Sequence, residues 1–366
     1  MSESKTILIE SSYYKDFRCL ADACPDTCCQ GWNIEIEPET LSLWQTLPAV
    51  PETAEHPGCL SPASFISTTE NRNGTASHKI RMDEHMRCPM LTADGLCSLV
   101  IAHGHEATTR ICRDYPRQFN EYEQVKQRTV SVRCAHVLDL LWSQDTFRYQ
   151  NAEDGQNCDQ VSFPSKGLLD GFLSYGNTPE LASGDLLITA FEALYKTHKK
   201  LEALMPVDSQ GLRDYGQEFI DDRNTQETLS FLKPLTVLSQ TPSAPDLSVF
   251  KELLRTCHDM MYDVMQSFFD NPVFGDSFLD LFLASQTLLA GSVTAEQYQA
   301  FLSGSFLPSG MDEKLKLLIL EQFFTSVFTL EVLDYESLLV RLQWLIVQYQ
   351  VVRYILFLDA QSHDSL

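Results

Sequence analysis

The stretch CLADACPDTCCQGW, from Cys19 to Trp32, contains four cysteines within eleven residues, two of them adjacent. Free cysteine is commonly a small buried residue, but this density favours metal ligation over simple packing. A disulfide between Cys28 and Cys29 would close a strained ring. If the segment is helical or turn-like, the four-residue step from Cys24 to Cys28 places both sulfurs on one face, and Cys29 addresses a different side.

Two further cysteines flank a predicted turn. In RCPMLTADGLCSL, residues 87–99, Cys88 and Cys97 lie on the two arms of a tight turn expected at Asp94-Gly95. This turn would bring the two thiols together.

The last two candidate cysteines lie in ICRDYPRQF, residues 111–119, and in SVRCAHVLDLLW, residues 131–142. Pro116 breaks any helix that follows Cys112, and Cys134 begins an apolar, helix-like run. The full set of candidate metal ligands is Cys19, Cys24, Cys28, Cys29, Cys88, Cys97, Cys112 and Cys134.

Eight thiolates can fill two four-ligand sites, or one site with spare or structural thiols. All-sulfur ligation suits an iron–sulfur cluster and zinc alike, so both stay open. Cys59, Cys158 and Cys257 stand apart from the set and are expected to be ordinary structural residues. The chain has no GxGxxG nucleotide loop, no Walker-type GK[ST] and no CxxxCxxC loop of radical S-adenosylmethionine enzymes.

Composition limits the partners of the chain. Its 366 residues carry a formal net charge of −23. Nucleic acid is a poor partner because phosphate binding needs a basic face. An acidic surface can attract a lysine-rich partner, although solubility alone also explains the charge.

Targeting signals are absent from the N-terminus, which lacks the charged-then-apolar design of a signal peptide. A cytoplasmic location with reduced thiols is therefore expected. The most apolar late stretch, LQWLIVQYQVV, has eleven uncharged residues between Arg341 and Arg353, whereas a membrane span needs about 20. We expect a buried or surface-associated helix and no transmembrane segment, while peripheral membrane association and oligomerisation stay open.

The predicted fold class is α+β and predominantly α-helical, with a small cysteine-rich metal-binding N-terminal lobe followed by an α-helical C-terminal domain. The expected divisions are a cysteine-rich region at residues 1–145, a linker-like segment at 146–183 and a helical domain at 184–366. WNIEIE, residues 32–37, is an alternating, strand-like piece of the first region.

Helices are predicted in the last region by apolar residues that recur at three- and four-residue steps. Asp246 is a natural N-cap, and TAEQ at Thr294–Gln297 is a capping-box start. The expected helical ranges are 184–205, 246–269, 312–333 and 337–358.

The cysteine-bearing motifs together resemble the flagellin lysine-N-methylase family. FRCLADACPDTCCQGWNIEIEPET, residues 17–40, looks like the opening of these proteins. CPMLTADGLCSL and CRDYPR follow in the order that the family shows, and VSVRCAHVLDLL is similar to its later cysteine before a helix. The motif match covers roughly the first 142 residues. The chain departs from the family at Cys134-Ala135-His136, where members have Cys-Pro-Glu.

The resemblance implies a methyltransferase that uses S-adenosylmethionine to methylate lysine ε-amino groups of flagellin, and a cysteine-held [4Fe-4S] cluster that the transfer requires. In CRDYPR, Arg113 and Arg117 could receive the carboxylate of the cofactor or tune the cluster. Asp114 and Tyr115 are candidates for holding or deprotonating the lysine, whose amine is a nucleophile only when neutral. A salt-bridged turn that supports Cys112 explains the same residues. The alternative function is a non-enzymatic zinc- or iron–sulfur-binding protein, for metal chelation or redox sensing.

Overall fold

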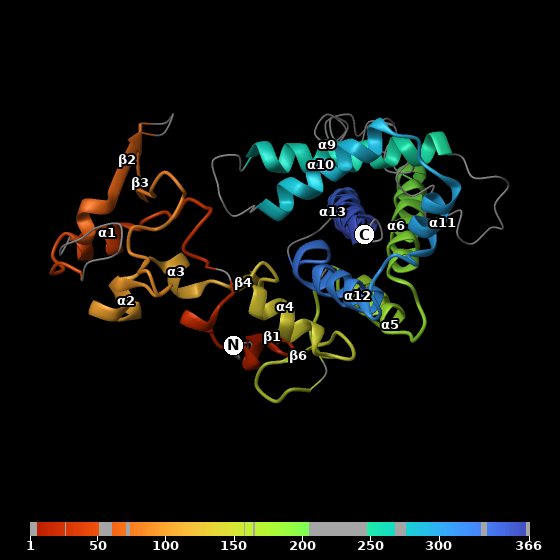
Figure 1. Ribbon diagram of the computed structural model, residues 1–366. Helices are drawn as coiled ribbons and strands as arrows, with labels where there is room; N and C mark the ends of the chain where they lie inside the picture. Colours follow the sequence, from red (N-terminus) through yellow and green to blue (C-terminus); the bar gives the residue numbers. More distant parts are fainter. Residues whose placement is uncertain are drawn as a thin grey trace.

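A computed structural model of the chain describes residues 6–25, 27–50, 61–70, 74–156, 158–163, 165–204, 247–267, 276–330 and 335–363. Three neighbouring parts are visible in Figure 1: a small lobe that carries α1 to α3, a β-sheet, and a body of helices. The predicted class is confirmed, because the fold is mixed α/β with a helical C-terminal part.

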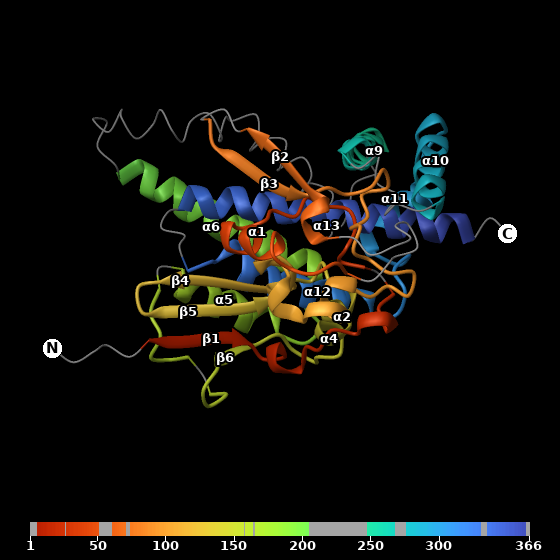
Figure 2. The same cartoon turned by 90° about the vertical axis from the view of Figure 1, so that its left-hand side faces the viewer.

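A four-stranded sheet lies between the lobe and the helices, with the strand order β4-β5-β1-β6 (Figure 2). Its strands are β1 (Ile7–Ser11), β4 (Arg117–Tyr122), β5 (Val125–Val130) and β6 (Tyr149–Asn151). β4 and β5 form an antiparallel hairpin, β1 is parallel to β5, and β6 is antiparallel to β1. The chain therefore leaves the sheet after β1 and returns to it only at β4.

The small lobe fills the interval between β1 and β4 and has its own hydrophobic core. Trp44 is fully buried there, and its indole Nε1 donates to the carbonyl of Ala107 at 2.7 Å. The elements of the lobe are α1 (Pro38–Trp44), β2 (Ile66–Glu70), β3 (Ala76–Ile80), α2 (Ser98–His103), α3 (Arg110–Asp114) and short 3-10 turns at Ala21–Ala23, Pro62–Phe65 and His105–Ala107.

Helices form the rest of the described chain, and the helical pattern of the C-terminal sequence is confirmed. Thr294 and Gln297 form the expected capping box at the start of α11. The expected N-cap at Asp246 lies outside the described residues. The helices are α4 (Ala135–Trp142), α5 (Lys166–Gly176), α6 (Ser183–Leu204), α9 (Leu247–Ser267), α10 (Asp276–Ala290), α11 (Ala295–Ser303), α12 (Met311–Gln322) with a π-helical turn at Phe323–Val327, and α13 (Tyr335–His363).

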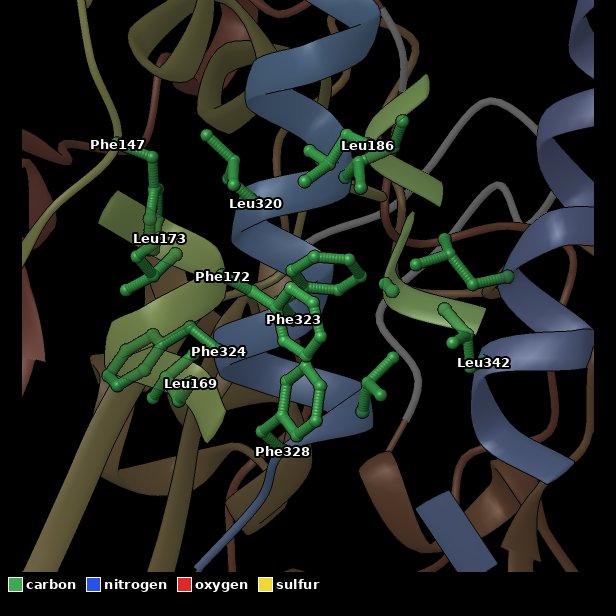
Figure 3. Close-up of a cluster of buried hydrophobic side chains, with 14 of the residues drawn as sticks. Phe147, Leu169, Phe172, Leu173, Leu186, Leu320, Phe323, Phe324, Phe328 and Leu342 are labelled. Atoms are coloured by element: carbon green, nitrogen blue, oxygen red, sulfur yellow. The ribbon is translucent and has the colours of Figure 1, made fainter. Parts of the chain in front are cut away.

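The main hydrophobic core joins the sheet to the helices (Figure 3). The ring of Phe172 on α5 stacks on that of Phe328 with 5.5 Å between centroids. From the sheet, Tyr149 stacks on Phe324 at 5.0 Å, and the buried Gln127 donates to the Phe324 carbonyl at 2.9 Å. Segment 146–183, expected as linker-like, thus carries β6 and α5, whose side chains belong to this core.

One expected element differs in detail, and the helix expected at 342–352 is confirmed. Residues 32–37 do not form a regular strand. They are extended and bond to β3, with Ile36 N–H donating to the His78 carbonyl and Ile80 N–H to that of Ile34, both at 2.9 Å. The stretch 342–352 belongs to α13, where Leu342 and Ile346 are buried and Trp344 is exposed. Within the described ranges, no helix combines the length and apolar character needed to cross a membrane.

A first prediction concerns two glycines of α5. A Cβ added at the buried Gly176 would overlap the side chain of Leu320, whereas one at Gly171 would meet nothing within 4 Å. Gly176→Ala should lower the free energy of unfolding by about 1–3 kcal/mol through overpacking. Gly171→Ala should raise it by about 0.5–1 kcal/mol, because alanine is the better helix former. Urea unfolding measures both, and equal shifts would contradict the packing seen here.

A second prediction concerns Glu321, a fully buried carboxyl on α12 that accepts from the side chain of Gln322 at 2.7 Å. Burial raises its pKa to about 8, against about 4.3 in an unfolded chain. Between these values the unfolded chain loses the proton and the folded chain keeps it, so stability falls as pH rises.

Glu321→Gln removes this titration while preserving the shape. Relative to wild type, the variant should gain stability with pH by up to about 1.4 kcal/mol per pH unit between pH 5 and 8. Denaturant unfolding at several pH values measures this difference. Glu313→Gln, on the exposed side of the same helix, is the control, and identical pH profiles for wild type and Glu321→Gln would contradict the assignment.

Candidate metal centre

The candidate cysteines lie where the chain passes through the lobe between β1 and β4. Backbone bonds fix two of their segments side by side. The Cys88 N–H donates to the Cys29 carbonyl at 2.8 Å, the Gly31 N–H donates to the Met86 carbonyl at 2.9 Å, and Gln30 pairs with Arg87. The adjacent cysteines of the opening stretch therefore lie beside Cys88, although almost sixty positions separate them.

The predicted turn at Asp94-Gly95 is present. Thr92 N–H donates to the Leu96 carbonyl at 2.8 Å, and Gly95 has a φ of 77°, a conformation that glycine adopts without strain. Leu91 pairs with Cys97 across the turn. Cys97 is thereby brought near Cys88, as expected.

Helix starts and turns supply hydrogen bonds to several sulfurs. Cys97 is the N-cap of α2, and its thiol accepts from the backbone of Leu99 and Val100. Cys134 is the N-cap of α4, as the sequence predicted, and its thiol accepts from the backbone of His136 and Val137. Such amides favour the thiolate form, which is the form that binds metal.

Five cysteines form one group, here called the thiol cluster: Cys28, Cys29, Cys88, Cys97 and Cys112. Each of the other four lies close enough to Cys28 for the two to interact electrostatically. The clustered cysteines come from three segments of the lobe and border its hydrophobic core.

The pKa is raised at four thiols of this cluster, those of Cys29, Cys88, Cys97 and Cys112. Burial, with a smaller contribution from neighbouring thiols, raises the pKa of Cys88 to about 12 and that of Cys112 to about 11. Hydrogen bonding with Cys28 and then burial raise the pKa of Cys29. A cation would remove the repulsion, because a metal replaces the thiol protons.

The donor set of the cluster fits zinc or an iron–sulfur cluster, both of which take four sulfurs. In the side-chain positions of the described residues, however, no three His, Cys, Asp or Glu groups already enclose an ion. Metal binding would require the clustered thiols to turn toward a common point.

The remaining candidates lie outside the thiol cluster. Of the two conformations considered for Cys24 and Cys28, the segment is turn-like and not helical: the 3-10 turn ends at Ala23, and Cys24 has extended angles (φ −71°, ψ 129°). Cys24 and Cys28 both act electrostatically on Cys134, so these three could form a second ligand group. The Cys19 sulfur accepts from the Ala21 N–H at 3.4 Å, with no thiol contact among the described residues.

Of the three cysteines expected to be structural, two are buried in hydrophobic cores. Cys158 is buried in the main core and Cys257 in a second core among α9, α11 and α13. Cys59 lies outside the described residues.

The candidate cofactor residues of the CRDYPR segment have local partners. Arg113 donates to the carbonyls of Thr108 at 2.7 Å and Glu106 at 3.2 Å, which braces the turn before α3. Arg117 lies over the ring of Phe17 with 5.1 Å to the centroid. Asp114 and Tyr115 are half-buried at the end of α3, directly after Cys112.

Two further residues, Trp32 and Glu37, lie near the thiol cluster. Trp32 donates from Nε1 to the Cys28 carbonyl at 2.7 Å and lies against Tyr115, with 5.5 Å between ring centroids. Glu37 accepts from the Arg110 N–H at 2.9 Å and raises the pKa of Cys112. The signal for Trp32 was its position three residues after Cys29, whereas nothing in the sequence connected Glu37 with Cys112.

Three Salmonella proteins with sequence similarity to the chain include two that are named Lysine-N-methylase. The Lysine-N-methylase of Salmonella choleraesuis (strain SC-B67) is 25% identical over 133 residues, which cover 36% of this chain and 31% of the relative. The Lysine-N-methylase of Salmonella typhimurium (strain LT2) gives the same identity and coverage. The Flagellar biosynthetic protein FliU of Salmonella muenchen is also 25% identical over 133 residues, which cover 75% of its length.

These matches confirm the resemblance to lysine-N-methylases for about a third of the chain. The chain spans about a third of the length of the two lysine-N-methylases that it matches. No family model matches the chain. No solved structure matches it either.

A third prediction tests the thiol cluster. Cys28→Ser should lower the metal bound per chain at least severalfold, because it removes the thiol that interacts with all four others. Cys257→Ser, in the separate core of α9, should keep the wild-type metal content. Elemental analysis of the purified proteins measures both, and equal metal loss in the two variants would exclude the cluster as the binding site.

Proposed function

We propose that this chain is an S-adenosylmethionine-dependent methyltransferase that methylates lysine ε-amino groups of flagellin and that depends on a cysteine-held [4Fe-4S] cluster. The similarity to relatives named Lysine-N-methylase is the observation that carries the proposal. Two further observations support it: a relative is named for flagellar biosynthesis, and five thiols gather in one small lobe.

The thiol cluster would hold the iron–sulfur group. Cys134 interacts electrostatically with Cys24 and with Cys28 of the cluster, so Cys24 and Cys134 would lie beside the bound group. When bound, that group would supply an iron centre capable of redox or Lewis-acid chemistry. Trp32 and Tyr115 pack together next to Cys28 and would restrict the access of water to this side of the lobe. Arg113 would keep Cys112 in place through its bonds to the preceding turn.

Methyl transfer to lysine requires a neutral amine, and the usual lysine pKa is about 10.4. Asp114 and Tyr115 are the proposed groups for holding the ε-amine and taking its proton, since both lie beside the thiol cluster at the end of α3. Arg117, at the neighbouring start of β4, is the proposed partner of an anionic group. The net charge of −23 would attract a substrate surface rich in lysine.

Metal binding without methyl transfer is the second candidate function. It is favoured by the position of the thiols against a small core, where zinc or a cluster could serve only to tie the lobe together. Anaerobically purified protein distinguishes the metals: an iron–sulfur protein is brown, whereas a zinc protein is colourless. Colourless, zinc-loaded protein would reject the iron–sulfur part of the proposal.

A fourth prediction tests the enzyme activity directly. Purified protein incubated with flagellin and methyl-labelled S-adenosylmethionine should transfer label to flagellin lysines, located by mass spectrometry. Asp114→Asn should reduce the rate by about 100-fold or more, as expected for the loss of a general base.

Tyr115→Phe should also slow the transfer, whereas Tyr175→Phe, on the exposed side of α5, should leave the rate unchanged. Unlabelled flagellin with metal-loaded wild-type protein would overturn the proposed activity in favour of the metal-binding alternative. Equal rates for Asp114→Asn, Tyr115→Phe and wild type would be compatible with the methyltransferase activity but would show that neither residue takes part in the transfer.

A further inference from the structure

A pocket of about 390 Å³ opens in the helical body, among α6, α11, α12 and α13, away from the lobe that carries the cysteines (Figure 1). Its volume is in the range of small-molecule sites. Part of the wall is apolar, formed by Ile188, Leu302 and Leu307. The lining also carries charged groups, and the positive and negative ones come from different helices.

The positive group is Arg353 on α13, which is only 3% exposed. Its guanidinium donates to the Phe301 carbonyl and lies over the rings of Phe301 and Tyr349, at 5.0 and 5.6 Å from the centroids. Its Nε has no hydrogen-bond partner, and no carboxylate among the described residues forms an ion pair with it. A buried cation of this kind is costly unless an anion neutralises it.

Three carboxylates line the pocket: Asp185 at the start of α6, and Asp312 and Glu313 in the first turn of α12. Asp312 accepts from the backbone N–H of Ser183 at 3.0 Å and from its hydroxyl at 2.5 Å. The Ser183 hydroxyl in turn bonds to that of Tyr349 at 2.8 Å. Burial and then Asp312 raise the pKa of Asp185, so these two carboxylates repel each other.

Tyr349 connects the two charges: its hydroxyl bonds to the Ser183 hydroxyl that donates to Asp312, and its ring lies under the Arg353 guanidinium. The pocket therefore offers one buried cation from α13 and carboxylates from the starts of α6 and α12. A ligand that satisfies both needs an anionic and a cationic group a short distance apart. The carboxylate and ammonium of an α-amino acid have that arrangement.

We propose that this pocket binds the zwitterionic head group of an α-amino acid, with its carboxylate at Arg353 and its ammonium between Asp185 and Asp312. The apolar wall would receive the remainder of the molecule. Either a free amino acid or the methionyl end of S-adenosylmethionine carries this head group. Only the second source depends on the proposed methyltransferase function.

Calorimetric titration of the full-length protein with four probes tests the proposal. S-adenosylmethionine, S-adenosylhomocysteine and L-methionine carry the head group, whereas 5′-methylthioadenosine lacks it. At least one of the first three should bind, and methylthioadenosine should bind tenfold more weakly or not at all. Tighter binding of S-adenosylmethionine identifies the methyl donor as the ligand, and tighter binding of methionine identifies a free amino acid. Failure of all three, or equal binding of methylthioadenosine, overturns the proposal.

Variants locate the binding in this pocket. Asp185→Asn, at an exposed position, should weaken head-group binding by about tenfold or more, the effect of losing a charged hydrogen bond. Arg353→Lys keeps the charge but loses the planar fork, and should weaken it further. Glu192→Gln on the same helix lies outside the pocket and should leave binding unchanged. Unchanged binding by Asp185→Asn overturns the assignment.

The methylation assay separates this inference from the proposed function. Flagellin methylation with an unchanged KM for S-adenosylmethionine in Asp185→Asn would keep the methyltransferase and reject this pocket as the donor site. Head-group binding that is sensitive to Asp185→Asn, in a protein that methylates no flagellin, would keep the pocket and reject the methyltransferase.

Discussion

The parallel pairing of β1 with β5 holds the two ends of the cysteine lobe together, and a buried charge secures it. Glu10 on β1 is fully buried and lies opposite Arg128 on β5. Arg128 reaches the Glu10 carboxylate at 2.6 Å from Nη2 and 2.7 Å from Nε, and Lys15 approaches it at 3.4 Å. Removing one partner of such a buried pair leaves an uncompensated charge that costs about 3–5 kcal/mol. The pairing of β1 with β5 therefore holds both ends of the lobe at the same sheet.

Closure at β1 and β5 explains how a small lobe can keep its thiols in one place. The lobe core is made of few buried side chains around Trp44 and Phe65, and small cores contribute little stability by themselves. Fixing both ends of the lobe to one sheet removes much of the chain entropy that would otherwise oppose the thiol cluster. A metal bound by Cys28, Cys88 and Cys112 would join three segments of the lobe and act as a second closure.

Local patterns in the sequence were enough to predict the elements that depend on neighbouring residues. The turn at Asp94-Gly95, the start of α4 at Cys134 and the capping box at Thr294 each rest on interactions within a few positions. The same local reasoning favours the turn-like alternative at Cys24, because Pro25 follows it and the residue before a proline is driven to extended angles.

Long-range pairing was beyond such reasoning. Nothing in ILIES or VKQRTV predicts that Ile7 lies opposite Val125. The register depends on which face of the sheet is buried, and here Gln127 and Tyr149 meet Phe324 of the π-helical turn. For the same reason segment 146–183 looked like a linker: its polar loops dominate the composition, while Phe147, Leu169 and Phe172 pack into the main core. The sequence was enough to predict which cysteines are candidate ligands. Only the fold shows that the thiols around Cys28 form one group and that Cys19 lies outside it.

The separation between the thiol cluster and the charged pocket limits the chemistry that one chain can perform. The cluster belongs to the lobe of α1 to α3, whereas Arg353 and Asp312 belong to the helical body (Figure 1). If the pocket holds the methyl donor, an iron–sulfur group in the lobe cannot ligate the methionyl head group in this arrangement. The iron–sulfur group would then stabilise the fold of the lobe or act as a redox centre. If the donor binds at the lobe, the buried Arg353 needs another anion, and a free amino acid is the ligand whose charges complement the pocket. Either outcome assigns the two sites different ligand chemistries, because one offers thiols that bind metal as thiolates and the other offers fixed, opposite charges.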